Sequence, residues 1–175
     1  PRDPFRMFLQ EPGMIYRPPS LEYPFGTDQY GRDVLSRVIW GTRVSLFVGF
    51  VSASISALVG IALGAIAGFY GGKIDNMIMR LVDVFMTLPT FFLILSIAFI
   101  FGGSIWNVMV IIGLTIWPST ARMIRAEFLS FKEREFVKAA RVVGASNLYI
   151  VFREILPNAV FVAIVNTSLQ VAGAI

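Results

Sequence analysis

The chain contains no cysteine and no histidine, and charged residues make up only 15% of its 175 positions. Without these two residue types, disulfide bonds, thiolate or imidazole metal sites and histidine acid-base catalysis are excluded within this sequence. Met77, Met79 and Met86 have no other soft ligand beside them, so we interpret them as packing residues, and we predict no metal site. The sequence also lacks a glycine-rich phosphate-binding loop ending in Lys and Ser or Thr, so we expect no ATP hydrolysis by this chain.

Hydrophobic residues are abundant: they make up 56% of the sequence, and the mean hydropathy is +0.73. The charges gather in a few blocks between long uncharged stretches, which is typical of a protein whose solvent is the lipid bilayer. The net charge of +4 fits either nucleic-acid binding or the basic cytoplasmic loops of a membrane protein, and the hydropathy favours the second. Because the chain begins at Pro1 and ends at Ile175 inside an apolar run, we expect a piece of a longer protein.

Uncharged stretches predict four membrane crossings and hence an all-α fold, a polytopic membrane helical bundle. Residues 44–70 are long enough to cross a hydrocarbon core of roughly 30 Å. Residues 84–121 are too long for one crossing, so we expect two crossings joined by a hairpin at 101–107. Residues 157–175 form the last predicted crossing.

A polar segment, residues 1–43, precedes the transmembrane domain, residues 44–175. The first part of this segment is rich in proline, so we expect it to be extended rather than helical. From residue 28 to residue 40, apolar residues fall on one helical face, and Thr27 or Asp28 can cap the start. We therefore predict a short amphipathic helix that lies at the membrane interface.

Small residues recur at every fourth position of the first crossing: Ser52, Ser56, Gly60, Gly64 and Gly68. Such side chains let a second helix approach closely in lipid. We therefore interpret this stripe as a helix-packing face rather than as part of a transport passage.

Two amides lie in the last crossing. Asn166 and Gln170 are four residues apart and therefore share one helical face. Because an unsatisfied amide in lipid is costly, they either hydrogen-bond to a neighbouring helix or line a passage.

Two charged loops, residues 71–83 and 122–156, fall on the same side of the membrane by parity. This side holds more Lys and Arg than the N-terminal side, so the positive-inside rule favours 122–156 as cytoplasmic. We interpret Arg80 and Asp83, three residues apart in the first loop, either as an ion pair that anchors a helix start or as contacts with a cytoplasmic partner.

Residues 135–157, in the second charged loop, predict two short helices that meet at a glycine. Glu135, Lys138 and Arg141 alternate with apolar residues in the first helix. Gly144 stands where a left-handed C-terminal cap would lie. Ser146 or Asn147 can cap a second helix, which we expect to end at Pro157.

Three interpretations of this segment are open. An alanine pair, a glycine turn and an apolar helix fit a DNA-binding helix-turn-helix, but two flanking crossings leave no room for the third helix that such domains need. A plain cytoplasmic loop with incidental helicity fits the periodicity. In a docking element, Ala139 and Ala140 would let the helix enter a groove on a cytoplasmic partner, and the helices would carry the partner's movement into the membrane.

The segment resembles the Glu-Ala-Ala loop of prokaryotic ABC importer permeases. The positions that match its pattern are Glu135, Ala139, Ala140, Gly144, Ile155, Leu156 and Pro157. The resemblance implies an ATPase-coupling loop at 135–157, which also includes Lys138, Arg141 and Ala145. The stretches "FGTDQYGRDVLSRVIWGTRVSL", "GFYGGKIDNMIMRLVD" and "REILPN" resemble the dipeptide, oligopeptide and nickel branch, in its second permease subunit type.

This resemblance implies a multi-pass permease subunit in the prokaryotic plasma (inner) membrane, with the type I importer fold and about four of six crossings present. The implied partners are a homologous permease subunit, two cytoplasmic ABC ATPases that hold ATP and magnesium, and an extracytoplasmic solute-binding protein toward which residues 1–43 would face. Peptides are the expected solute, and nickel or glutathione is the alternative. An ion-coupled transporter or channel subunit is a further alternative, but no acidic residue lies deep in a crossing to support it.

Overall fold

The computed structural model describes residues 3–5, 7 and 13–173, and it divides into two compact units, Pro1–Phe47 and Val48–Ile175. Apart from an isolated antiparallel bridge between Thr27 and Asp33, the regular structure of the described residues is helical, which confirms the all-α prediction. The helices are α1 (Val34–Tyr70), α2 (Gly72–Thr87), α3 (Thr90–Phe101), α4 (Ile105–Lys132), α5 (Glu135–Val142), α6 (Asn147–Tyr149), η1 (Ile150–Ile155, a π-helix) and α7 (Leu156–Gly173).

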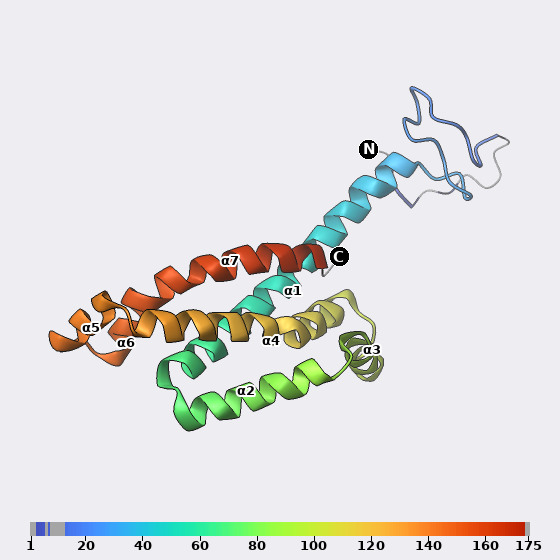
Figure 1. Ribbon diagram of the computed structural model, residues 1–175. Helices are drawn as coiled ribbons and strands as arrows, with labels where there is room; N and C mark the ends of the chain where they lie inside the picture. Colours follow the sequence, from blue (N-terminus) through green and yellow to red (C-terminus); the bar gives the residue numbers. More distant parts are fainter. Residues whose placement is uncertain (1–2, 6, 8–12, 174–175) are drawn as a thin grey trace. The chain divides into compact units, whose positions relative to one another are not determined.

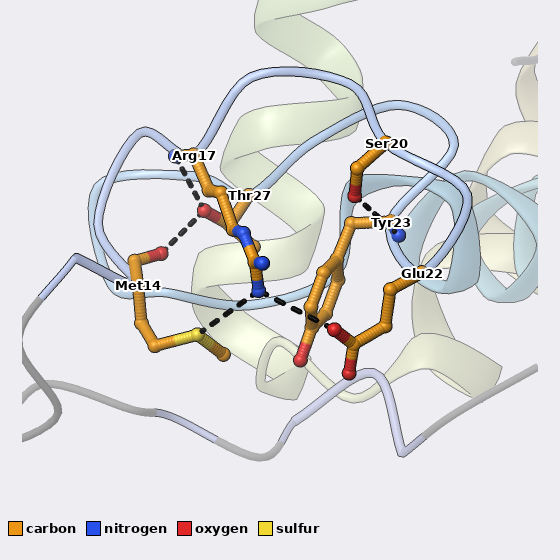
Figure 2. Close-up of polar contacts among 6 residues, drawn as sticks. All are labelled: Met14, Arg17, Ser20, Glu22, Tyr23 and Thr27. Atoms are coloured by element: carbon orange, nitrogen blue, oxygen red, sulfur yellow. Dashed lines mark hydrogen bonds and ion pairs between the residues drawn. The ribbon is translucent and has the colours of Figure 1, made fainter.

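Hydrogen bonds around Thr27 hold the N-terminal unit together (Figure 2). The Thr27 hydroxyl donates to the carbonyl of Met14 and accepts the amide of Arg17 at 2.8 Å. The guanidinium of Arg17 lies 3.4 Å from the carboxylate of Glu22, and the ring of Tyr23 is buried beside them. The proline-rich segment is therefore a folded set of turns rather than an extended strand.

Helix α1 begins at Val34, so the prediction of a separate amphipathic helix at 28–40 is wrong. The carboxylate of Asp33 accepts the amide of Ser36 at 3.2 Å and its hydroxyl at 2.5 Å, which makes Asp33 the cap in place of Thr27 or Asp28. No proline interrupts the sequence from this cap to Tyr70, so one helix continues through. Its 37 residues correspond to about 55 Å, well over the thickness of a hydrocarbon core.

Among the described residues, three helical segments are long and apolar enough to cross a membrane: Val34–Tyr70, Ile105–Lys132 and Asn147–Gly173. A fourth crossing exists only if α2 and α3 count as one span, because they bend by 89°. Leu88 is extended (φ −81°, ψ 135°) ahead of Pro89, which restricts the residue before it and ends α2. The predicted crossing after residue 84 is therefore a bent pair of helices, and the hairpin is confirmed as the short link at 102–104.

The predicted loop at 71–83 is also corrected, since α2 starts at Gly72 and carries most of its charges. Gly71 and Gly72 both have positive φ, 67° and 55°, so the predicted tight turn lies where it was expected. The acidic residue in the first turn of α2, Asp75, is placed favourably for the helix dipole.

The small-residue stripe of α1 packs against α4, as predicted. A Cβ built on Gly60 would lie 2.6 Å from Cβ of Thr120, and one built on Gly68 would lie 2.6 Å from Cβ of Phe128. The Ser52 hydroxyl donates to the carbonyl of Met109 at 3.0 Å. At Gly60 and Gly68 the two helices approach so closely that even a Cβ would collide.

Within the second unit, α4 contacts α2, α3 and α7 (Figure 1). Figure 1 shows α5 and α6 at the same end of this unit as the turn between α1 and α2, and α3 at the opposite end. The charged segment 133–146 and the Gly71 turn therefore share one end of the helical bundle.

Candidate functional site

The candidate site is the coupling segment, which we define as residues 135–157. Its first helix, α5, has Glu135 in the first turn and Arg141 in the last turn, so both charges complement the helix dipole. After α5 the chain reverses at Gly144, whose φ of 84° lies in the left-handed region. The Gly144 amide donates to Arg141 and the Ala145 amide donates to Ala140, both at 3.0 Å. This is a Schellman cap, and it confirms the predicted glycine turn.

The second helical part of the segment does not end at Pro157, contrary to the prediction. Ser146 caps it through its hydroxyl, which accepts the amide of Tyr149 at 3.3 Å, and the helix then runs through η1 into α7. Proline has no amide hydrogen and its ring collides with the carbonyl four residues earlier. The π-helix relieves this conflict, because the amide of Leu156 bonds five residues back to Val151.

The coupling segment is fixed to the membrane helices by an apolar core. Val137 of α5 and both ends of η1, Ile150 and Ile155, are fully buried in one cluster with Phe128 of α4 and Phe69 of α1. A displaced α5 would expose this cluster, so α5 and η1 are expected to move together with α4 and α7 as one body.

Charged contacts add to this attachment at the same end of the bundle. The Lys132 ammonium donates to the carbonyl of Phe69 at 2.8 Å, which places a cation on the C-terminal turn of α1. Arg125 of α4 forms a two-point ion pair with Asp75 of α2, at 2.5 and 2.6 Å.

Asp83 of α2 pairs with Arg122 of α4. The predicted pair between Arg80 and Asp83 is therefore wrong. Residues three apart on α2 share a face, but a charge on the neighbouring helix competes for the same carboxylate.

The sequence-predicted residues of the coupling segment divide by burial. Ile155 is buried, whereas Ala140, Ala145 and Leu156 are partly buried against the core cluster. The exposed members are Glu135, Lys138, Ala139, Arg141, Gly144 and Pro157. The alanine pair is thus split, with Ala140 packed inward and Ala139 facing solvent.

The structure adds an apolar tip that sequence reasoning missed. Val142, Val143 and Leu148 are exposed by 87%, 83% and 67%, on both sides of the Gly144 turn. Val142 and Val143 are neighbours in the chain, and adjacent exposed aliphatic side chains are typical of a protein interface; Leu148 borders a separate hollow with Ile66 of α1. The available signal was the position of these apolar residues next to a predicted turn.

The amides of α7 hydrogen-bond to neighbouring helices. Asn166 and Gln170 both donate to the Thr120 hydroxyl of α4, at 3.2 and 2.9 Å. The Ser56 hydroxyl of α1 donates to Gln170 at 3.0 Å. Three helices therefore meet at one polar cluster, which fits the alternative that the two amides hydrogen-bond to a neighbouring helix. A role of these amides in lining a passage stays a prediction.

Comparison with known proteins gives a family match and curated relatives. The model of a family described as "Binding-protein-dependent transport system inner membrane component" matches residues 60–175. One relative is a protein of Brucella abortus biovar 1 that is named as a peptide permease. It is 45% identical to this chain over 157 residues, and the match covers 90% of this chain and 52% of the relative. The dipeptide transport system permease protein DppC of Haemophilus influenzae is 37% identical over 100% of this chain and 59% of its own length. The oligopeptide transport system permease protein OppC of the same organism is 38% identical over 93% of this chain and 53% of its own length. The chain spans about half the length of the curated relatives it matches.

Proposed function

Because this chain belongs to the family of inner membrane components of binding-protein-dependent transport systems, we propose that it forms part of the permease subunit of an ATP-driven peptide importer. It is a multi-pass helical membrane protein of a transport family, and the relatives named above are peptide, dipeptide and oligopeptide permeases. Their names support peptides over nickel or glutathione as the solute.

The observation that carries the proposal is the attachment of the coupling segment. A partner that binds the apolar tip at Val142 and Val143 would move a body that includes α5, η1 and the cytoplasmic ends of α4 and α7. Since Val137 and Ile155 are fully buried in this body, a rotation of α5 is transmitted to the transmembrane helices rather than absorbed by a flexible loop. This is what an ATP-driven importer requires at the contact between its membrane and ATPase subunits.

Under this proposal the chain supplies half of the passage, and other subunits supply the energy. The expected partners are a homologous permease subunit, two cytoplasmic ABC ATPases and an extracytoplasmic solute-binding protein. ATP and magnesium would bind the ATPases, since this sequence has no phosphate-binding loop. The folded N-terminal unit would then face outward toward the solute-binding protein. An ion-coupled transporter, by contrast, would need no ATPase at the apolar tip.

Cysteine labelling tests the proposal cleanly because the sequence has no cysteine of its own. We expect Lys138→Cys, on the exposed face of α5, to react with a membrane-impermeant thiol reagent only from the cytoplasmic side, and to be protected when the ATPase subunits are bound. The matched control is Gly103→Cys, exposed in the link at the opposite end, which should react from outside with or without ATPases. Labelling of the α5 position only from outside would refute the coupling role.

The solute is tested by transport. Proteoliposomes that contain the full-length permease pair, the ATPases and the solute-binding protein should accumulate a radiolabelled dipeptide when ATP is present. Uptake of nickel or glutathione, and not of dipeptide, would reassign the solute while leaving the coupling role unchanged.

A further inference from the structure

An open hollow of about 570 Å³ lies between α5 and η1, on the coupling segment. Small residues line it, among them Ala139 of α5 and Gly144 of the turn. Phe136, Val143 and Tyr149 form apolar and aromatic walls around it. The hollow therefore has room for a side chain from a partner.

The lining of the hollow carries one negative charge. Glu154 is the one charged residue that lines it, and this residue is half-buried. Among residues 13–173, none of the ion pairs engages the Glu154 carboxylate. The nearby lysine of α5, Lys138, lies 4.0 Å from Glu133 instead. The carboxyl end of α5 also borders the hollow through Val143, and the negative end of a helix dipole favours a cation.

We propose that this hollow receives an arginine side chain of the cytoplasmic ATPase, with its guanidinium paired to Glu154. An arginine suits the site in three respects: its aliphatic stem packs on Val143, its flat guanidinium stacks on an aromatic wall, and its donors match a carboxylate. The same charge repels phosphate, so an anionic lipid headgroup and a nucleic acid are disfavoured. The proposal rests on the proposed function, because it names the partner's group at the coupling segment.

The test measures binding of the transporter's own ATPase subunits to the full-length permease pair in nanodiscs, as a function of salt. Glu154→Gln keeps the side-chain shape and removes the charge, so we expect about tenfold weaker binding and a weaker salt dependence. Glu133→Gln is the matched control, with the same change of charge on a 74%-exposed side chain outside the hollow, and it should stay within about twofold of the parent. Glu154→Gln binding within twofold of the parent would overturn the proposal.

A double-mutant cycle then identifies the partner group. Surface arginines and lysines of the ATPase are replaced one at a time by glutamine, and one arginine replacement should weaken binding no further when it is combined with Glu154→Gln. If only a lysine couples in this way, or if no residue couples, the arginine assignment is wrong. Protection of Lys138→Cys in the same preparations distinguishes a failure of the Glu154 contact from a failure of the proposed function. This protection reports docking of the ATPase whether or not Glu154 takes part.

Discussion

Replacing Gly64 by alanine should destabilise the helical bundle, although alanine is normally the better helix residue. In the structure a Cβ on Gly64 would lie 2.5 Å from the carbonyl oxygen of Ala121 and 2.9 Å from Cβ of Ile124. An ordinary contact needs at least 3.4 Å, so α1 and α4 must separate by about 0.9 Å at this crossing. The nearest atom, the carbonyl oxygen of Ala121, belongs to the backbone, so it cannot move away by a change of rotamer as a side chain could.

The magnitude follows from overpacking, which costs about 1–3 kcal/mol when a rigid neighbour must move. Thermal or denaturant unfolding of the full-length subunit in detergent micelles measures this loss. Gly113→Ala, on the α4 side of the same interface, should behave alike, since its Cβ would lie 2.7 Å from Cβ of Ile55. Gly41→Ala in α1 is the control, because nothing lies within 4 Å of a Cβ there.

Replacing Gly60 and Gly64 together by alanine tests the same interface. Gly60 lies one turn from Gly64 on α1, and it faces Thr120 of α4. A separation of α1 and α4 forced by one alanine therefore partly relieves the clash of the other alanine. The two losses should therefore sum to more than the loss in the double variant. If Gly64→Ala unfolds like Gly41→Ala, or is more stable than the parent, the close-packed interface is wrong.

The remaining predictions concern the turn, the polar cluster and the N-terminal unit. Gly144→Val should abolish transport but leave membrane insertion intact, because a β-branched residue at φ 84° costs about 1–2 kcal/mol or more; unchanged uptake with ATPase coupling would contradict the coupling role proposed for residues 135–157. Replacing Asn166 and Gln170 together by Leu should weaken complex assembly along with uptake if these amides serve packing; normal assembly with lost uptake would instead indicate a passage-lining role. Burial raises the pKa of Asp28, but hydrogen bonds from the side chain and amide of Arg32, from the Tyr30 amide and from Arg37 outweigh it and lower this pKa from 3.8 to about 2. A lowered pKa means that the carboxylate stabilises the folded N-terminal unit above pH 3.8 and that this contribution is lost as the pH falls toward about 2, so hydrogen-exchange protection of residues 14–33 should drop over that range in the parent and not in Asp28→Asn.

The sequence predicted the features that depend on residue type at a single position or on a simple spacing. The stripe from Ser52 to Gly68 marked a close helix contact, because only small residues permit one in lipid. Gly144 marked the end of α5, because few other residues adopt positive φ at low cost. The apolar stretches marked the membrane helices, since length and hydropathy are set locally.

Other features depended on which neighbour lies nearby, and sequence spacing does not contain that information. The N-terminal cap is Asp33 rather than Thr27 or Asp28, because Thr27 bonds to Met14 and Arg17 whereas Asp28 is engaged by Arg32 and Arg37. The helix beyond Pro157 was unexpected because its continuation requires a widened π-turn.

What the sequence determined by itself is therefore a set of helices, a packing stripe and a glycine turn after residue 143, since each follows from local sterics or from transfer of apolar residues into lipid. Only the tertiary structure decided that Asp83 pairs with Arg122, that Val137 and Ile155 bury the coupling segment in the bundle, and that Glu154 borders an open hollow. Those outcomes arise when segments distant in sequence compete for the same charges and the same space, and only the folded chain determines which contact forms.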